Sequence, residues 1–282
     1  MSFGSGGGAH AHSAALVEPP LPDAPIVDEI ASARRADRWR RRLIFAVVWI
    51  VLVGGLGLFL WNAGRVDAEF IVKSGPYILG GIWITILVSV LSIMLATVLA
   101  IVGALGRLST NPVTYAIATL YVSLVRGTPL LVQIFFAYYA LPQAGIVLPP
   151  IPTGILALGF NYGAYMTEIF RAGIQAVPRG QSEAAQALGM RESHTFRRIV
   201  LPQAVRIVIP AIGNEFIAMI KDSSLVSVIT VQELLWRAQN VGRAEFQTIP
   251  AILIAALCYW VLTIIFSLFQ DRLERRLSRG ER

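Results

Sequence analysis

A short polar segment between two long apolar stretches has the pattern best suited to binding another protein. Its distinguishing positions in residues 183–202 are Glu183, Ala184, Ala185, Gly189, Ile199, Leu201 and Pro202. Alanine side chains are small enough to let another backbone approach closely. The chemistry that these residues suit is docking rather than catalysis. An ordinary amphipathic loop has similar spacing, so that alternative stays open at this point.

The same segment predicts a short helix followed by a turn. Ser182 is expected to cap a helix over residues 182–188, with Glu183 in its first turn, where a carboxylate is favourable. Gly189 is expected to end that helix in the left-handed conformation. Ser193 is then expected to cap a second helix that leads into the next apolar stretch.

A second group of polar residues lies inside apolar stretches, where a charge costs about 2.5–3.5 kcal/mol if the stretch spans a membrane. These residues are Arg126, Asn161, Asn214 and Glu215, together with Glu168 and Arg171. Glu168 and Arg171 are three apart on a helix and are expected to pair structurally. The others either form hydrogen bonds between helices or line a path for a solute.

Arg126 has two interpretations of its own. Because it precedes Gly127 and Pro129, which interrupt a helix, it is expected to stabilise a bend by satisfying freed backbone groups. Alternatively, its guanidinium meets the carboxylate of a substrate.

The motifs of several enzyme classes are missing from the chain. It has no G-x-x-x-x-G-K-[ST] phosphate loop and no H-E-x-x-H zinc motif. Two of its three histidines, His10 and His12, lie near the beginning, and His194 is expected at the surface. We therefore expect no catalytic residue, no metal site and no bound cofactor on this chain.

Composition indicates an all-α integral membrane protein. Hydrophobic residues make up 55% of the 282 residues and charged residues only 15%, against about 25% charged in soluble domains. A span needs about 20 apolar residues. The chain is therefore expected to contain about six spans, over residues 43–61, 77–106, 113–141, 153–170, 204–220 and 251–270.

The basic residues predict the orientation of these spans. With six spans and a cytoplasmic N-terminus, 17 of the 24 Lys and Arg residues fall in cytoplasmic segments and 5 in outer ones. This distribution follows the positive-inside rule, so both termini are expected in the cytoplasm. It also accounts for the net charge of +7 without any binding of nucleic acid.

The chain is expected to divide into four segments. Residues 1–42 are rich in Gly, Ala, Ser and Pro and are expected to be a disordered tail, whose arginine cluster contacts anionic lipid headgroups. Residues 43–61 form an extra span, interpreted as an uncleaved anchor rather than a signal peptide. Residues 77–276 form the main transmembrane domain with its loop at 178–202, and residues 277–282 are a basic tail.

The docking pattern resembles a known motif. Residues 183–202 match EAA-x3-G-x9-I-x-LP without a gap, as in the loop of permease subunits of ABC importers. Residues 125–133, 164–171, 214–217 and 221–225 resemble signatures of the polar amino-acid permeases in the histidine, glutamate, glutamine, arginine and opine group. The resemblance covers residues 77–276.

This resemblance implies a five-helix type I (MetI-like) core, to which residues 43–61 add one helix. It also implies that the helix at Glu183–Gly189 couples to a separate ATPase subunit that binds ATP. The remaining implied partners are a second permease, identical or not, a periplasmic solute-binding protein and a polar amino acid. Ser223 stands where the family usually has threonine, and Glu215 stands where it has Glu or Gln.

Two other classes of function compete with this interpretation. A six-helix secondary transporter would need no ATPase and is expected to show internal symmetry, which the sequence lacks. A membrane anchor or scaffold would carry no solute at all.

Overall fold

The computed structural model describes residues 24–64 and 67–277, and all its regular elements in these ranges are helical. The chain separates into two units, residues 1–63 and residues 64–282. The expected all-α membrane fold is therefore confirmed. The outer parts of the two predicted tails, residues 1–23 and 278–282, lie outside the described residues.

The first unit contains helix α1 (Ala24–Gly64). It begins well before the predicted span at residue 43, so residues 24–42 of the predicted tail are helical. An ion pair of 2.9 Å between Arg41 and Asp37, one turn apart, supports this helix. Arg40, Arg41 and Arg42 are exposed on it, directly before the apolar stretch.

The second unit is a bundle of helices. In chain order these are α2 (Ala68–Leu79), α3 (Gly81–Arg107), α4 (Pro112–Arg126), α5 (Leu130–Gln143), α6 (Pro150–Gln175), α7 (Arg179–Ala187), α8 (Glu192–Thr195), the π-helical turn η1 (Phe196–Val200), α9 (Leu201–Asp222), the 3₁₀ segment η2 (Ser223–Ile229), α10 (Leu234–Ala244) and α11 (Thr248–Leu277).

Four helical segments of the described residues are long and apolar enough to cross a membrane: Trp39–Phe59, Ala68–Arg107, Glu192–Ile229 and Thr248–Arg276. Helices α4 and α5 pass the same test together although they bend by 105°, which raises the number to five. The predicted number of six is not confirmed. The predicted span at 153–170 lies in α6, which does not meet the criterion.

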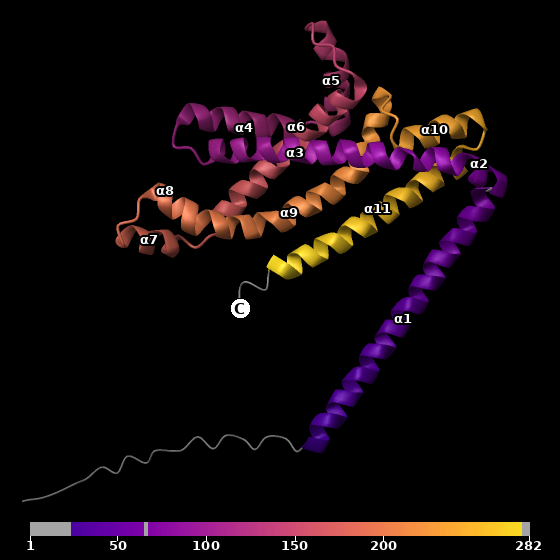
Figure 1. Cartoon of the computed structure of the whole chain (residues 1–282), viewed down its shortest axis with the longest axis horizontal. Coiled ribbons are helices and arrows are strands. Elements are labelled where there is room, and N and C mark those ends of the chain that lie inside the picture. Colours follow the sequence, from indigo (N-terminus) through magenta and orange to yellow (C-terminus); the bar gives the residue numbers. More distant parts are fainter. Residues whose placement is uncertain (1–23, 65–66, 278–282) are drawn as a thin grey trace, which may run out of the picture. The chain divides into compact units, whose positions relative to one another are not determined.

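Helix α6 is less apolar because it packs against protein. Helices α3 and α6 lie side by side at the centre of the unit (Figure 1). Gly159 and Gly163 of α6 face Leu95 and Leu99 of α3 so closely that a Cβ would come within 2.7–2.9 Å of their side chains. Small residues allow such close packing between membrane helices.

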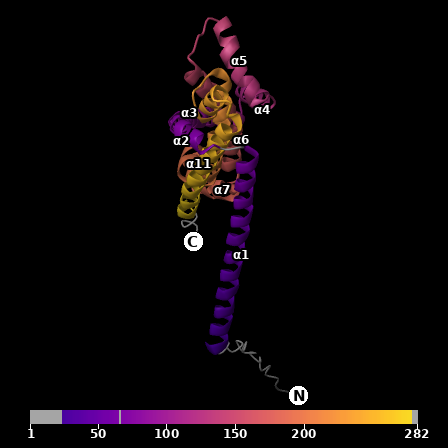
Figure 2. The ribbon, with the colours of Figure 1, turned by 90° about the vertical axis from the view of Figure 1, so that its right-hand side faces the viewer.

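Helices α4 and α5 are interrupted at Gly127, Thr128 and Pro129. The two views show α5 extending away from the centre of the second unit (Figures 1 and 2). Ile134 is the one residue of α5 that is fully buried in the described structure, and the other residues of this helix are partly buried or exposed.

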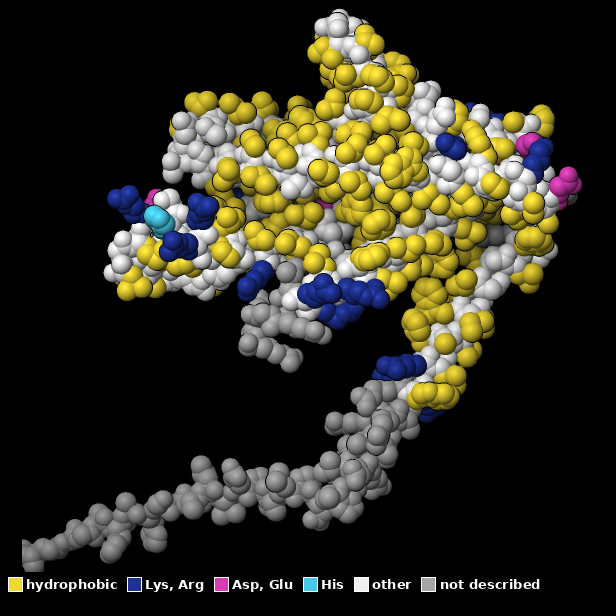
Figure 3. All heavy atoms as spheres, viewed as in Figure 1, with side chains coloured by type: hydrophobic (Ala, Val, Ile, Leu, Met, Phe, Trp, Pro, Cys, Tyr) yellow, Lys and Arg dark blue, Asp and Glu magenta, His cyan; other side chains and the backbone are white. Residues whose placement is uncertain are grey.

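Apolar side chains cover much of the visible surface of the second unit. Arginine side chains gather over α7 and α8 and at the end of α11 (Figure 3). Charged side chains also occur near α2 and α10, at the far end of the bundle, where Lys73 and Glu245 form an ion pair of 2.8 Å. The apolar band therefore lies between two polar ends.

A buried carboxylate organises the end that carries α10. Glu233 is fully buried, accepts a hydrogen bond of 2.8 Å from the Trp236 N–H as the N-cap of α10, and accepts another from the Tyr259 hydroxyl of α11. Helix α10 spans Leu234–Ala244, and helix α2 (Ala68–Leu79) begins between the predicted spans at 43–61 and 77–106.

The α3–α6 contact predicts a test of packing. Replacing Gly159 with Ala should lower the thermal unfolding midpoint of the detergent-solubilised protein, because overpacking costs about 1–3 kcal/mol. The matched control is Gly75→Ala, since a Cβ at Gly75 meets nothing within 4 Å. Equal midpoints for the two variants would contradict the close α3–α6 contact.

Candidate functional site

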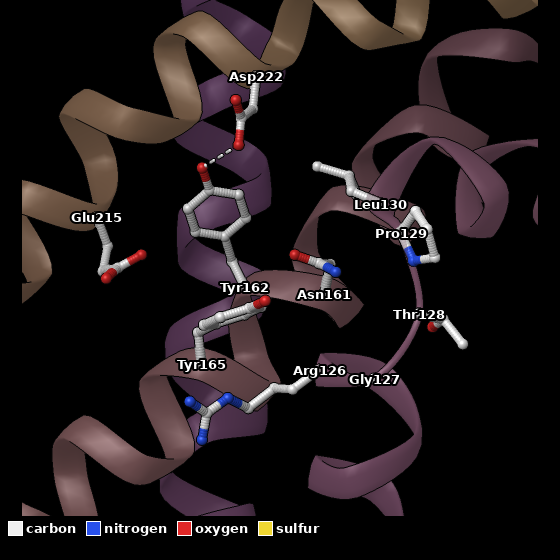
Figure 4. A pocket seen from close by; sticks show the side chains of 10 residues that line it. All are labelled: Arg126, Gly127, Thr128, Pro129, Leu130, Asn161, Tyr162, Tyr165, Glu215 and Asp222. Atoms are coloured by element: carbon white, nitrogen blue, oxygen red, sulfur yellow. Dashed lines mark hydrogen bonds between the residues drawn. The ribbon is translucent and has the colours of Figure 1, made fainter.

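A polar cavity of about 440 Å³ lies between the α4–α5 break, α6 and α9. Its lining residues are Arg126, Gly127, Thr128, Pro129, Leu130, Asn161, Tyr162, Tyr165, Glu215 and Asp222 (Figure 4). Three of the four predicted path residues, Arg126, Asn161 and Glu215, therefore meet in one place. They come from three different helices.

The cavity brings together charges of opposite sign. The Arg126 guanidinium lies 5.1 Å from the centre of the Tyr165 ring, an arrangement typical of a cation–π contact. Glu215 and Asp222 contribute two carboxyl groups from α9. The Tyr162 hydroxyl donates a hydrogen bond of 2.8 Å to Asp222 (Figure 4). A ligand with both a negative and a positive group fits this chemistry.

The fourth predicted residue, Asn214, does not line the cavity. It is exposed, whereas its neighbour Glu215 is partly buried and faces the cavity. Successive helix residues point about 100° apart, and here the Asn214 side chain points away from the space that Glu215 faces. Sequence reasoning missed Tyr162, Tyr165 and Asp222 as lining residues. Tyr165 and Asp222 belong to the segments 164–171 and 221–225, whose resemblance to family signatures is the signal that could have found them.

The helix break is stabilised by Gln133 rather than by Arg126. The Gln133 side-chain amide donates to the Val125 carbonyl at 2.8 Å, to the Thr128 carbonyl at 3.2 Å and to the Thr128 hydroxyl at 2.8 Å. Its oxygen accepts a hydrogen bond of 3.2 Å from Asn161. The carbonyls of Val125 and Thr128 at the break thus find a polar side chain on α5, eight and five residues further along the chain. The predicted role of Arg126 in the bend is wrong, because its guanidinium extends to Tyr165.

Glu168 and Arg171 form an ion pair of 2.7 Å. Glu168 also contacts Arg107 of α3 at 3.2 Å, and Arg107 donates a hydrogen bond of 2.6 Å to Thr119 of α4. This partly buried group of charges therefore joins α3, α4 and α6. The link to Arg107 spans 61 residues of sequence and could not be inferred from local spacing.

The segment that carries the Glu183–Pro202 motif forms a helical hairpin of α7 and α8. Helix α7 begins at Arg179, with Pro178 rather than Ser182 as its N-cap residue. Arg191 rather than Ser193 is the N-cap residue of α8. Proline suits the start of a helix because it has no N–H to leave unsatisfied, which explains the earlier start of α7. The two expected serine caps are therefore wrong.

Gly189 ends this helix as predicted. It has φ +76°, and the Met190 N–H donates to the Ala185 carbonyl at 3.0 Å while the Gly189 N–H donates to the Gln186 carbonyl at 2.9 Å. This is the Schellman arrangement, which favours glycine at the left-handed position.

The hairpin has one buried side and one free side in the described residues. Ala185 and Val200 are buried, and Ile199 is partly buried. A second set of residues is exposed: Glu183, Ala184, Leu188, Leu201 and Pro202. Leu188 is 84% exposed, which is unusual for a leucine at a polar end of the molecule. The exposed side therefore carries small and apolar groups.

The π-helical turn η1 connects the hairpin to α9. The Leu201 N–H donates to the Phe196 carbonyl, five residues earlier. Pro202 has no N–H to donate, and single π-helical turns inside helices are frequent at functional sites. Gln203 donates to Gln181, which ties α9 directly to α7.

Residues 96–279 match the family of "Binding-protein-dependent transport system inner membrane component" proteins. The chain belongs to this family. The match includes the cavity, the hairpin of α7 and α8, and all of α9 and α11. Family membership confirms the expectation of a multi-pass membrane permease of the ABC importer type.

Two relatives from Bacillus subtilis (strain 168) support this assignment. The chain is 43% identical over 205 residues to the L-cystine transport system permease protein TcyB, covering 72% of this chain and 88% of the relative. It is 38% identical over 218 residues to the arginine transport system permease protein ArtQ, covering 77% of this chain and all of the relative.

Solved structures show the same fold. The crystal structure of an amino acid ABC transporter with histidines has 37% identity and a TM-score of 0.72, over 75% of this chain and 99% of the other. An inward-facing MetNI methionine ABC transporter has 16% identity and a TM-score of 0.62, over the same shares of the two chains. The MetI-like core is thus confirmed, and a secondary transporter is not favoured.

The network at the helix break predicts the effect of one substitution. Replacing Gln133 with Leu leaves two carbonyls and the Asn161 amide with fewer partners, which should lower stability by about 1–3 kcal/mol. The thermal unfolding midpoint of the purified protein in detergent measures this loss. Gln143→Leu is the control, because Gln143 lies exposed on the same helix. An unchanged midpoint for Gln133→Leu would show that water satisfies the break.

Proposed function

We propose that this chain is the permease subunit of an ATP-driven importer for a polar amino acid, and that the cavity is part of the substrate path. The observation that carries the proposal is the meeting of Arg126, Glu215 and Asp222 at one cavity in a permease fold. The relatives named for cystine and arginine transport support an amino acid as the solute.

The charges suggest how an amino acid would be held. Its carboxylate would pair with the Arg126 guanidinium, which can donate two parallel hydrogen bonds. Its ammonium group would lie near Glu215 and Asp222. Asn161 and the Tyr165 ring would complete the polar lining. Each of these contacts is a proposed role for the residue.

The hairpin of α7 and α8 is the proposed coupling element. Its exposed small residues and Leu188 would dock into a separate ATPase subunit, which binds and hydrolyses ATP. Ile199, Leu201 and Pro202 would carry the resulting movement into α9. We place this hairpin and both chain termini in the cytoplasm, which the gathering of arginines over α7, α8 and the end of α11 supports.

Two further partners belong to the proposal. A second permease, identical or different, would complete the path across the inner membrane. A periplasmic binding protein would deliver the solute at the end that carries α10.

Within the chain itself, the Glu168–Arg171 pair, with Arg107, would hold the helices together near the cytoplasmic end.

The decisive experiment is reconstitution of the chain in liposomes with the ATPase and binding protein encoded by neighbouring reading frames. Uptake of a panel of amino acids, with ATP inside the liposomes, should show transport of at least one polar amino acid. Equal uptake without the ATPase would instead favour a secondary transporter, and no uptake of any solute would favour a scaffold.

The cavity charges predict changes in transport. Arg126→Gln and Glu215→Gln should each raise KM for uptake about 10- to 100-fold, because each removes a hydrogen bond or ion pair to a charged group. The control is Asn214→Ala, which alters the neighbouring exposed side chain of α9. Uptake kinetics unaltered in both charge variants would remove the cavity from the substrate path.

The coupling hairpin predicts an uncoupled variant. Gly189→Val should lower uptake while ATP hydrolysis continues, because valine strongly disfavours a positive φ and the hairpin loses its shape. Gly180→Val is the control. A Cβ meets nothing within 4 Å at either glycine, and of the two only Gly189 has a positive φ. Normal uptake by Gly189→Val would exclude this coupling role.

A further inference from the structure

Helix α9 runs from the coupling hairpin to the cavity, and it contains a weak point between the two. Pro210 lies inside the helix, eight residues after Pro202 and five before Glu215. Because proline has no N–H, the Arg206 carbonyl loses its intrahelical partner. A push on the hairpin could therefore bend α9 at Pro210 instead of moving the cavity residues.

A side chain from another helix contacts α9 at this level. Gln270 of α11 is only 8% exposed, and its amide donates to the Pro210 carbonyl at 2.6 Å. The same nitrogen donates to Glu274 at 2.8 Å. A buried polar side chain is costly unless it is hydrogen-bonded, so this contact has a definite geometry.

The backbone of α9 is shaped to receive this amide. A Cβ at Gly213 would overlap the Gln270 side-chain oxygen and carbon, so the amide rests against the bare backbone of Gly213. One turn further along, Phe216 of α9 packs edge-on against Phe266 of α11, with ring centres 5.1 Å apart. Helices α9 and α11 are thus joined on both sides of Gly213.

From these contacts we propose that Gln270 is a positioning residue for transport, acting as a brace across the proline of α9. It makes α9 and α11 move as one body at Pro210, so that displacement of the hairpin reaches Glu215 and Asp222. Without the brace, α9 bends at Pro210 and ATP hydrolysis proceeds with less movement of the cavity. This inference rests on the proposed function.

The test uses the full complex in liposomes and measures ATP hydrolysed per amino acid taken up. Gln270→Leu should raise this ratio about fivefold, the shift in population that loss of one typical hydrogen bond allows. The amino acid used in this assay is the one that the wild-type complex takes up best from the panel. Glu274→Gln is the control and should leave the ratio unchanged, because it keeps an acceptor oxygen for Gln270.

A double variant separates a brace from mere packing. Gly213→Ala alone should raise the ratio, because its methyl group displaces the amide. Gly213→Ala combined with Gln270→Ala removes the overlap, but the hydrogen bond to Pro210 is still missing. The ratio of ATP hydrolysed to amino acid taken up should therefore stay raised. Recovery of the wild-type ratio in the double variant would overturn the proposal in favour of packing.

A wild-type ratio in Gln270→Leu would also overturn the proposal. With normal uptake and hydrolysis it would exclude a positioning role. With both rates reduced in equal proportion it would indicate a structural role alone. A wild-type complex that takes up no amino acid would instead refute the proposed function, so the two failures are distinguishable.

Discussion

Inside a bilayer, a helix can be interrupted only where other protein groups replace its lost hydrogen bonds. The break between α4 and α5 meets this constraint through the Gln133 amide, which bonds Val125, Thr128 and Asn161. Because the break is satisfied from within, the chain can turn by 105° while the Arg126 guanidinium extends to the Tyr165 ring. The cavity exists because that turn opens space beside α6.

The same constraint explains the composition of the helices around the cavity. Helix α6 is buried against α3, so it needs small residues for close approach more than it needs apolar surface for lipid. Its polar residues are partnered: Asn161 by Gln133, Tyr162 by Asp222, and Glu168 by Arg107 and Arg171. Helix α6 therefore contributes lining residues at one level and an ion-pair network at another.

Helix α9 connects these features to the exposed hairpin. It receives the hairpin through a π-helical turn at one end and presents Glu215 and Asp222 to the cavity at the other. Long helices transmit movement only as far as they stay rigid, and Pro210 interrupts that rigidity. The Gln270 contact lies at this point, where a support from α11 has the greatest mechanical effect.

Local sequence determined much of this protein. The apolar runs predicted the membrane fold, and the spacing of residues 183–202 predicted a docking hairpin with Gly189 at its left-handed turn, because both depend on nearby residues. Tertiary structure decided the rest. It decided that Glu215 faces the cavity and that Asn214 does not. It also decided that Gln133, and not Arg126, donates hydrogen bonds to the backbone at the helix break. Helical phase and long-range partners depend on which helices pack together, and no local pattern contains that information.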